Sequence, residues 1–157
     1  MKALIVYDSF FGNTEKVAQT MGDALAGEGE IVIRRVGDVQ ADDMTGLDLL
    51  IAGSPTRGFS PTPAITNWVK ELPPEMLEGV KVAAFDTRIA LADAPWFLSP
   101  LIRMFGYAAG PISRKLREKG GEVVIRPEGF AVQDTEGPMK EGELERAADW
   151  ARQAALK

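Results

Sequence analysis

Cysteine and histidine are both absent from the 157-residue sequence. Without cysteine, the chain can form no disulfide, no thiolate nucleophile and no cysteine-ligated zinc or iron–sulfur site. Without histidine, it has no Ser-His-Asp triad, no imidazole general base and no histidine metal ligand. We therefore predict no catalytic residue and no metal site, and any chemistry has to come from carboxylates or from a bound cofactor.

Positive charge is also scarce. Lys and Arg number 18 against 23 Asp and Glu, which gives a formal net charge of -5. This balance disfavours a protein that mainly neutralises nucleic-acid phosphates, and it disfavours a polybasic membrane anchor. The apolar run at residues 1–6 is too short for a signal peptide and precedes no small-residue cleavage pattern. We expect a cytoplasmic protein without stable membrane insertion.

The overall composition is that of an ordinary globular protein. Hydrophobic residues make up 45% and charged residues 26% of the chain, which argues against wholesale disorder. The length suits one domain with a substantial core. Because no internal repeat, linker or low-complexity tract interrupts the sequence, we predict a single domain over residues 1–157.

Apolar runs of strand length recur along the chain, at residues 3–7, 31–35, 47–53, 80–86 and 122–126. The first, third and fourth are almost continuously apolar, which is typical of parallel strands buried on both faces. Segments with helical periodicity follow them, at residues 17–25, 65–72, 112–116 (opened by Pro111) and 144–155. The polar segment 37–46 gives only a weak helical signal. This alternation predicts an α/β fold with a doubly wound, five-stranded parallel sheet and helices on both faces.

One stretch does not follow this alternation of strands and helices. Residues 89–109 contain only two charged residues, Asp93 and Arg103, and are broken by Pro95 and Pro100. A membrane span is improbable because of these interruptions. Two interpretations stay open: a long buried connection ending in an early helical turn, or an apolar wall beside a ligand or a partner protein.

The loop after the first predicted strand has an unusual composition. It combines hydroxyls, an amide and a glycine at the start of a helix, in the order Ser9, Phe10, Phe11, Gly12, Asn13 and Thr14. Such groups can hold a phosphate through neutral donors and the helix dipole. The alternative is an ordinary turn in which Asn13 or Thr14 caps the helix. Neither the G-x-x-x-x-G-K-[ST] nor the G-x-G-x-x-G spacing is present.

This loop resembles the phosphate-binding loop of flavodoxins, in which a hydroxyl residue and two variable positions precede Gly-x-Thr. The resemblance extends over essentially the whole chain. It implies the strand order 2-1-3-4-5, with FMN bound at the carboxyl ends of the strands, where ligands of open α/β sheets generally lie.

The resemblance also implies roles for the loops after the third and fourth strands. The third-strand loop would contact the flavin ring through Ser54, Pro55, Thr56, Arg57, Gly58 and Phe59. Pro55 and Thr56 would border the ribityl chain and the ring, and Gly58 would present a backbone group to flavin N5. The fourth-strand loop, Asp86, Thr87 and Arg88, would face the pyrimidine edge, unless Asp86 and Arg88 form a solvent-exposed ion pair. Of the two aromatic residues that would cover the ring, Phe59 is one candidate, and the other is Trp96, Phe97 or Tyr107.

Flavodoxin resemblance implies an FMN-binding electron carrier, because the cofactor supplies redox chemistry that this chain's side chains lack. Its partners would be a reductase-type donor and an acceptor protein, and the carrier would be a monomer or a weak dimer. The alternative is an FMN-dependent NAD(P)H:quinone-type oxidoreductase with residues 89–109 lining a substrate site. A receiver-type signalling domain is disfavoured because the third predicted strand ends in Gly53-Ser54 instead of an aspartate.

Overall fold

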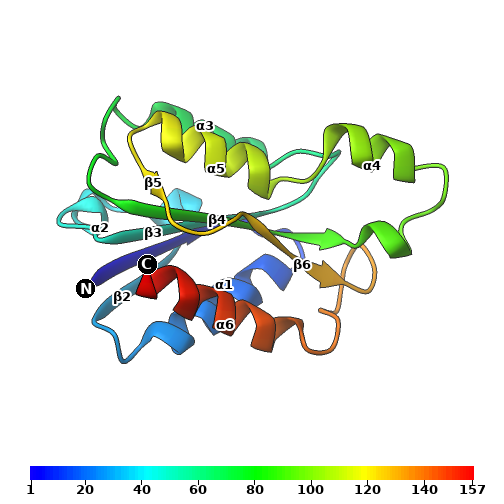
Figure 1. The fold of residues 1–157 in the computed structure, drawn as a ribbon, viewed down its shortest axis with the longest axis horizontal. Coiled ribbons are helices and arrows are strands. Elements are labelled where there is room, and N and C mark those ends of the chain that lie inside the picture. Colours follow the sequence, from blue (N-terminus) through cyan, green and yellow to red (C-terminus); the bar gives the residue numbers. More distant parts are fainter.

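A single sheet of parallel strands organises the computed structural model, which covers residues 1–157 and describes every side chain except those of Leu91 and Phe105 (Figure 1). The strands are β1 (Lys2–Tyr7), β2 (Glu30–Arg35), β3 (Leu49–Pro55), β4 (Lys81–Ile89), β5 (Glu122–Val123) and β6 (Glu128–Val132). Their order, β2-β1-β3-β4-β5, confirms the predicted topology. The α/β fold class is likewise confirmed.

The edge of the sheet beside β4 differs from the prediction. The strand expected at 122–126 ends at Val123, and an unpredicted strand, β6, pairs with the second half of β4. Residues 124–127 lie opposite only Ala83 and Ala84 of β4, so they leave the ladder between the two paired segments, and Pro127, the last of them, has no N–H to donate. Consequently β6 extends the edge toward the carboxyl ends of the strands.

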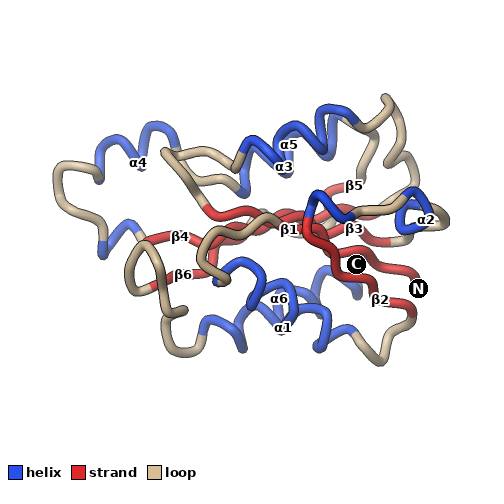
Figure 2. Tube along the Cα trace, turned by 180° about the vertical axis from the view of Figure 1, so that it is seen from behind, coloured by secondary structure: helices blue, strands red, loops and turns tan.

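Helices cover both faces of the sheet, as predicted. On one face lie α1 (Asn13–Leu25) and α6 (Glu143–Leu156), and on the other lie α3 (Pro63–Glu71) and α5 (Ala109–Glu118) (Figures 1 and 2). The segment 37–46 forms only a 3-10 turn (Val36–Asp38) and the short helix α2 (Ala41–Met44). α5 begins two residues before the predicted start at Pro111, because proline is tolerated within the first helical turn.

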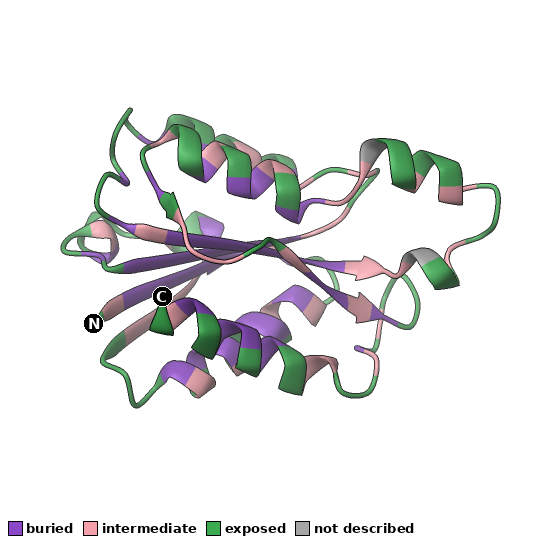
Figure 3. Cartoon of the chain, in the orientation of Figure 1, coloured by how far each residue is buried: buried purple, intermediate pink, exposed green. Residues whose placement is uncertain are grey.

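The core consists of two apolar layers, one on each face of the sheet (Figure 3). In the layer under α1 and α6, the rings of Phe85, Phe130 and Trp150 contact one another with centroid separations of 6.1 to 6.4 Å. Gly53 makes room for this cluster, since a Cβ atom there would lie 2.1 Å from Cζ of Phe85. The packing of the aromatic cluster therefore requires a glycine at position 53 of β3.

The stretch 89–109 is not a buried connection, and that interpretation is wrong. It contains a 3-10 turn (Leu91–Asp93) and the helix α4 (Ser99–Phe105), which lies beyond the end of α5 on the same side of the sheet (Figures 1 and 2). Trp96 is 85% exposed and Met104 75% exposed. None of the helices formed by described residues has the length and hydrophobicity needed to span a bilayer.

Glu143 connects α6 to the new edge strand and makes part of the stability pH-dependent. Its carboxylate accepts a hydrogen bond from the Ala131 N–H (2.7 Å) and pairs with Arg146 (2.9 Å). The hydrogen bond from Arg146 lowers the pKa of Glu143 below its ordinary value. The folded protein then holds this proton less tightly than the unfolded chain. The stabilisation is complete above the unfolded pKa and is lost as pH falls through the folded pKa.

We expect Glu143→Gln to lower the free energy of unfolding by about 1–3 kcal/mol at neutral pH. The difference from the wild type should begin to narrow as pH falls below the ordinary pKa of glutamate, about 4.3, and should close once the folded wild type also binds the proton. Urea unfolding at a series of pH values measures this difference. A gap that stays constant down to strongly acidic pH would show that the charge of Glu143 contributes nothing.

Candidate cofactor site

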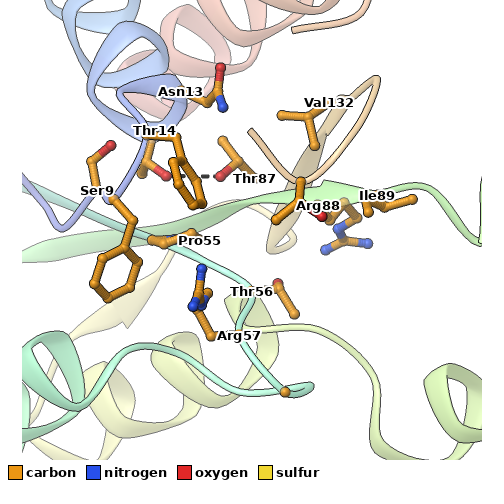
Figure 4. Close-up of a pocket in the computed structure, with 14 residues that line it drawn as sticks. Ser9, Asn13, Thr14, Pro55, Thr56, Arg57, Thr87, Arg88, Ile89 and Val132 are labelled. Atoms are coloured by element: carbon orange, nitrogen blue, oxygen red, sulfur yellow. Dashed lines mark hydrogen bonds between the residues drawn. The ribbon is translucent and has the colours of Figure 1, made fainter. Parts of the chain in front are cut away.

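A cavity of about 280 Å³ lies at the carboxyl ends of β1, β3 and β4 (Figure 4). All three loops that were predicted to form the site contribute to its walls. The predicted residues that line it are Ser9, Phe10, Phe11, Asn13, Thr14, Pro55, Thr56, Arg57, Gly58, Thr87 and Arg88. The predicted residues Gly12, Ser54, Phe59, Asp86 and Trp96 do not line it.

The first loop leads directly into the amino end of α1. Gly12 is the residue before the helix and adopts a left-handed conformation (φ 90°), and no side chain caps the helix in the described part of the chain. The Gly12 N–H instead donates to Ser9 Oγ (3.0 Å). The alternative in which Asn13 or Thr14 caps the helix is wrong, because both belong to its first turn. The first amides of α1 thus keep their hydrogen-bonding capacity for a ligand.

Thr14 links this loop to the loop after β4. Its side chain is buried, and its hydroxyl is hydrogen-bonded to the hydroxyl of Thr87 at 2.8 Å (Figure 4). Asn13 is anchored separately, since its amide donates to the Glu136 carbonyl at 3.1 Å. These bonds hold the polar end of the cavity in one arrangement.

In the second loop, the hydroxyls of Ser54 and Thr56 form hydrogen bonds with backbone groups. Ser54 is fully buried, and its Oγ accepts from the Thr62 N–H (2.9 Å) and donates to the Pro55 carbonyl (2.8 Å). Thr56 Oγ1 accepts from the Ala108 N–H at 3.1 Å, which ties the loop to the start of α5. Ser54 therefore shapes the cavity without reaching it.

The tip of the second loop is a tight hairpin turn. The backbones of Arg57 and Ser60 are hydrogen-bonded in both directions (2.8 and 3.0 Å). Between them, Gly58 and Phe59 both have positive φ angles, 53° and 67°, as in a type I′ turn. The positive φ expected at Gly58 is present, whereas that of Phe59 was not anticipated from the sequence.

Gly58→Val should reveal how strongly this turn requires the left-handed conformation. No atom lies within 4 Å of a Cβ built at Gly58, so the cost is conformational and not a steric clash. We expect a loss of about 1–2 kcal/mol in the free energy of unfolding, measured with urea. Gly58→Asn is the matched control, because asparagine tolerates this region and should lose clearly less. Equal losses for valine and asparagine would contradict this explanation.

In the third loop, a buried carboxylate holds an arginine at the cavity wall. Asp86 is fully buried, and its oxygens accept from Nε and Nη2 of Arg88 (2.6 and 2.7 Å) and from the Ala109 N–H (2.9 Å). The Arg88 guanidinium also lies 3.7 Å from the ring centroid of Tyr107. Burial raises the pKa of Asp86, while Arg88 and the amide act in the opposite direction. The ion pair considered from the sequence exists, but its acidic partner is shielded from solvent.

The aromatic residues around the cavity are arranged differently from the expectation. The Arg57 guanidinium lies over Phe10, 4.7 Å from the ring centroid, and 5.9 Å from that of Phe11. Trp96 instead packs edge-on against Phe97, with centroids 6.1 Å apart. Phe10 and Phe11 therefore provide the aromatic surface at the cavity, and the structure does not bring Trp96 to it.

Three lining residues were missed by the sequence analysis: Ile89, Val132 and Thr135. Ile89 is the last residue of β4, one position beyond the predicted loop residues. Val132 and Thr135 come from the end of β6 and the turn that follows. The apolar run 130–132 before a polar turn was the available signal for this wall.

The residues present fit FMN, the cofactor that the resemblance implied. The uncapped start of α1 and the neighbouring hydroxyls of Ser9 and Thr14 suit a phosphate. Apolar side chains on the other walls suit an aromatic ring system. Among the described residues that line the cavity, the charged ones are Arg57 and Arg88, so no carboxylate opposes an anionic ligand there.

Solved structures of other proteins have the same fold as this chain. A flavodoxin 2 from Bacillus cereus is 24% identical over 99% of each chain, with a TM-score of 0.76. An archaeal flavodoxin is 20% identical over 99% of this chain and 97% of that one, with a TM-score of 0.78. The rubredoxin oxygen:oxidoreductase of Desulfovibrio gigas is 17% identical over 98% of this chain but only 35% of its own, with a TM-score of 0.74.

No curated protein sequence matches the chain. The model of the family described as flavodoxin, however, matches residues 5–150. This range includes β3, β4, β6 and all three loops that build the cavity. By this match, the chain belongs to the flavodoxin family.

Proposed function

We propose that this chain binds FMN non-covalently in the cavity and carries electrons between redox partner proteins. Flavodoxins bind FMN, and the family and fold support an electron-transfer role. The observation that carries the proposal is the uncapped amino end of α1, which opens into a cavity whose lining includes hydroxyl and apolar side chains. When bound, FMN supplies the redox chemistry by taking up and releasing electrons.

The chain's own residues bind and orient the cofactor in this proposal. Ser9, Asn13 and Thr14, with the first amides of α1, hold the phosphate. Pro55 and Thr56 flank the ribityl chain and the ring, and the backbone of Gly58 lies near flavin N5. Arg88, which Asp86 fixes in place, puts positive charge beside the cofactor and favours its reduced, more negative form.

We favour a carrier over the NAD(P)H:quinone-type oxidoreductase. An enzyme of that kind needs a cavity that selects a small substrate over the ring. The exposed side chains of Trp96, Phe97 and Met104 build no such cavity. The cytoplasmic location and the monomeric or weakly dimeric state remain predictions of this proposal.

The proposal is tested by comparing stoichiometric electron delivery with turnover. The FMN-loaded protein is reduced with dithionite, freed of excess reductant and mixed anaerobically with cytochrome c, while NADPH and a quinone are supplied in a separate assay. We expect rapid delivery of the stored electrons to cytochrome c and no saturable oxidation of NADPH. Saturable NADPH–quinone turnover without any donor protein would identify an enzyme instead.

A further inference from the structure

A second concave region is lined by α5 and by the connection that joins β5 to β6. Figure 1 shows the course of these two segments. The region consists of two adjoining hollows of about 490 and about 360 Å³, which share Gly110, Arg114, Arg126 and Pro127. Arg117 lines the first hollow, and Arg88 lines the second. We call this continuous region the arginine groove.

The charge of the arginine groove is opposite to that of the whole molecule. The chain has a net charge of -5, yet among the described residues that line the groove there is no aspartate or glutamate. Arg114 and Arg117 are exposed and three positions apart on α5, so they share one helix face. Arg126 is exposed on the β5–β6 connection. A concentrated positive surface therefore stands out on an acidic protein.

These guanidinium groups also lack partners within the chain. In the part of the molecule that the structure describes, no side chain forms an ion pair or hydrogen bond with the guanidinium group of Arg114, Arg117 or Arg126; the Trp150 indole donates to the Arg126 backbone carbonyl instead. Other arginines do pair with carboxylates, namely Arg34, Arg35, Arg88, Arg146 and Arg152. The charges in the arginine groove are thus free to meet an external anion.

The arginine groove reaches the proposed FMN site. Arg88 lines both the groove and the cofactor cavity, and Asp86 and Tyr107 hold its guanidinium in place. A molecule in the groove would consequently lie against the wall of the cavity. A redox partner that docks on this side of Arg88 would therefore lie near the bound cofactor.

We propose that the arginine groove docks the acidic surface of a redox partner protein, an inference that rests on the proposed carrier function. Each exposed ion pair contributes only about 0–1 kcal/mol, so a small anion would gain little from these arginines. An acidic protein surface engages several of them together and is steered toward them over a distance. Arginine is also enriched at the centres of protein interfaces.

The test uses the FMN-loaded protein and two redox probes, a strongly acidic [2Fe–2S] ferredoxin and basic cytochrome c. Reduced ferredoxin passes an electron to the FMN-loaded protein, so the cluster is oxidised and the bound cofactor reduced. Separately, the dithionite-reduced FMN-loaded protein passes an electron to oxidised cytochrome c. Stopped-flow mixing gives both second-order rate constants as a function of salt.

The variant Arg114→Glu/Arg117→Glu is compared with Arg152→Glu/Lys157→Glu, which makes the same change in net charge on α6 and at the residue that follows it, across the sheet. We expect the groove variant to lower the rate constant for electron transfer from ferredoxin about tenfold or more at low salt. At high salt the groove variant and the wild type should differ little. The α6 variant should change this rate constant much less. Neither variant should lower the rate constant for electron transfer to cytochrome c.

Three results would overturn the inference. The two variants could lower the rate constant with ferredoxin equally, or this rate constant could be independent of salt in the wild type. Alternatively, millimolar inorganic phosphate at constant ionic strength could saturate the arginine groove. The last would assign the groove to a small anion. Failure of the carrier function would look different, because the wild type would then bind no FMN or deliver no electrons to cytochrome c.

Discussion

Thr14→Asp should weaken FMN binding by between a hundredfold and a thousandfold, while riboflavin binding falls far less. Thr14 is buried at the start of α1, where its hydroxyl meets that of Thr87. A carboxylate there would occupy the α1 amides and repel the phosphate. Two like charges about 4 Å apart at an effective dielectric near 20 repel by roughly 4 kcal/mol, which corresponds to about three orders of magnitude in affinity.

Thr14→Asn is the matched control, since it changes the side chain at the same place without adding charge. Isothermal titration of FMN and of riboflavin into all three proteins measures the effect. The helix should tolerate aspartate in its first turn, because negative charge is favourable at a helix amino end. Equal losses of affinity for FMN and riboflavin would show that Thr14 has a structural role only.

Phe85→Ala should lower the free energy of unfolding by about 3–5 kcal/mol, a large fraction of the stability of a typical domain. Phe85 is fully buried in β4, and its ring contacts those of Phe130 and Trp150. Truncation removes apolar burial and leaves a cavity that the rigid sheet fills only in part. Urea unfolding followed by far-ultraviolet circular dichroism gives the value.

Met104→Ala is the control for Phe85→Ala, because Met104 is 75% exposed. It should change the free energy of unfolding by no more than about 0.5 kcal/mol. A loss below about 1 kcal/mol for Phe85→Ala would mean that the aromatic cluster does not anchor the sheet.

The central strands could be predicted because burial on both faces leaves a continuous apolar run, as in β1, β3 and β4. The edge opposite β2 could not, because residues 124–127 leave the ladder between two paired segments, and hydrophobic periodicity does not show where such a break falls. Similarly, the composition of residues 89–109 suggests burial, but two prolines prevent a long element from packing onto the sheet. The exposure of Trp96 follows from tertiary packing, which local sequence does not encode.

The position of the candidate site was predictable for a topological reason. Loops that leave the carboxyl ends of neighbouring parallel strands meet at one edge of the sheet, and the structure brings Thr14, Thr56 and Thr87 to one cavity. The indirect contributors were harder to identify. Asp86 acts by holding Arg88 in place, and Ser54 acts through its hydrogen bonds to the backbone. Val132 reaches the cavity only because β6 extends the sheet edge.

The central claim is that the cavity binds FMN, with the phosphate at the start of α1. Calorimetric titration of the wild-type apoprotein with FMN and with riboflavin tests it most directly. We expect one FMN per chain, bound at least about tenfold more tightly than riboflavin, because the phosphate adds charge-assisted hydrogen bonds worth roughly 1.5–3 kcal/mol. Equal affinity for the two flavins, or no binding of FMN, would contradict it.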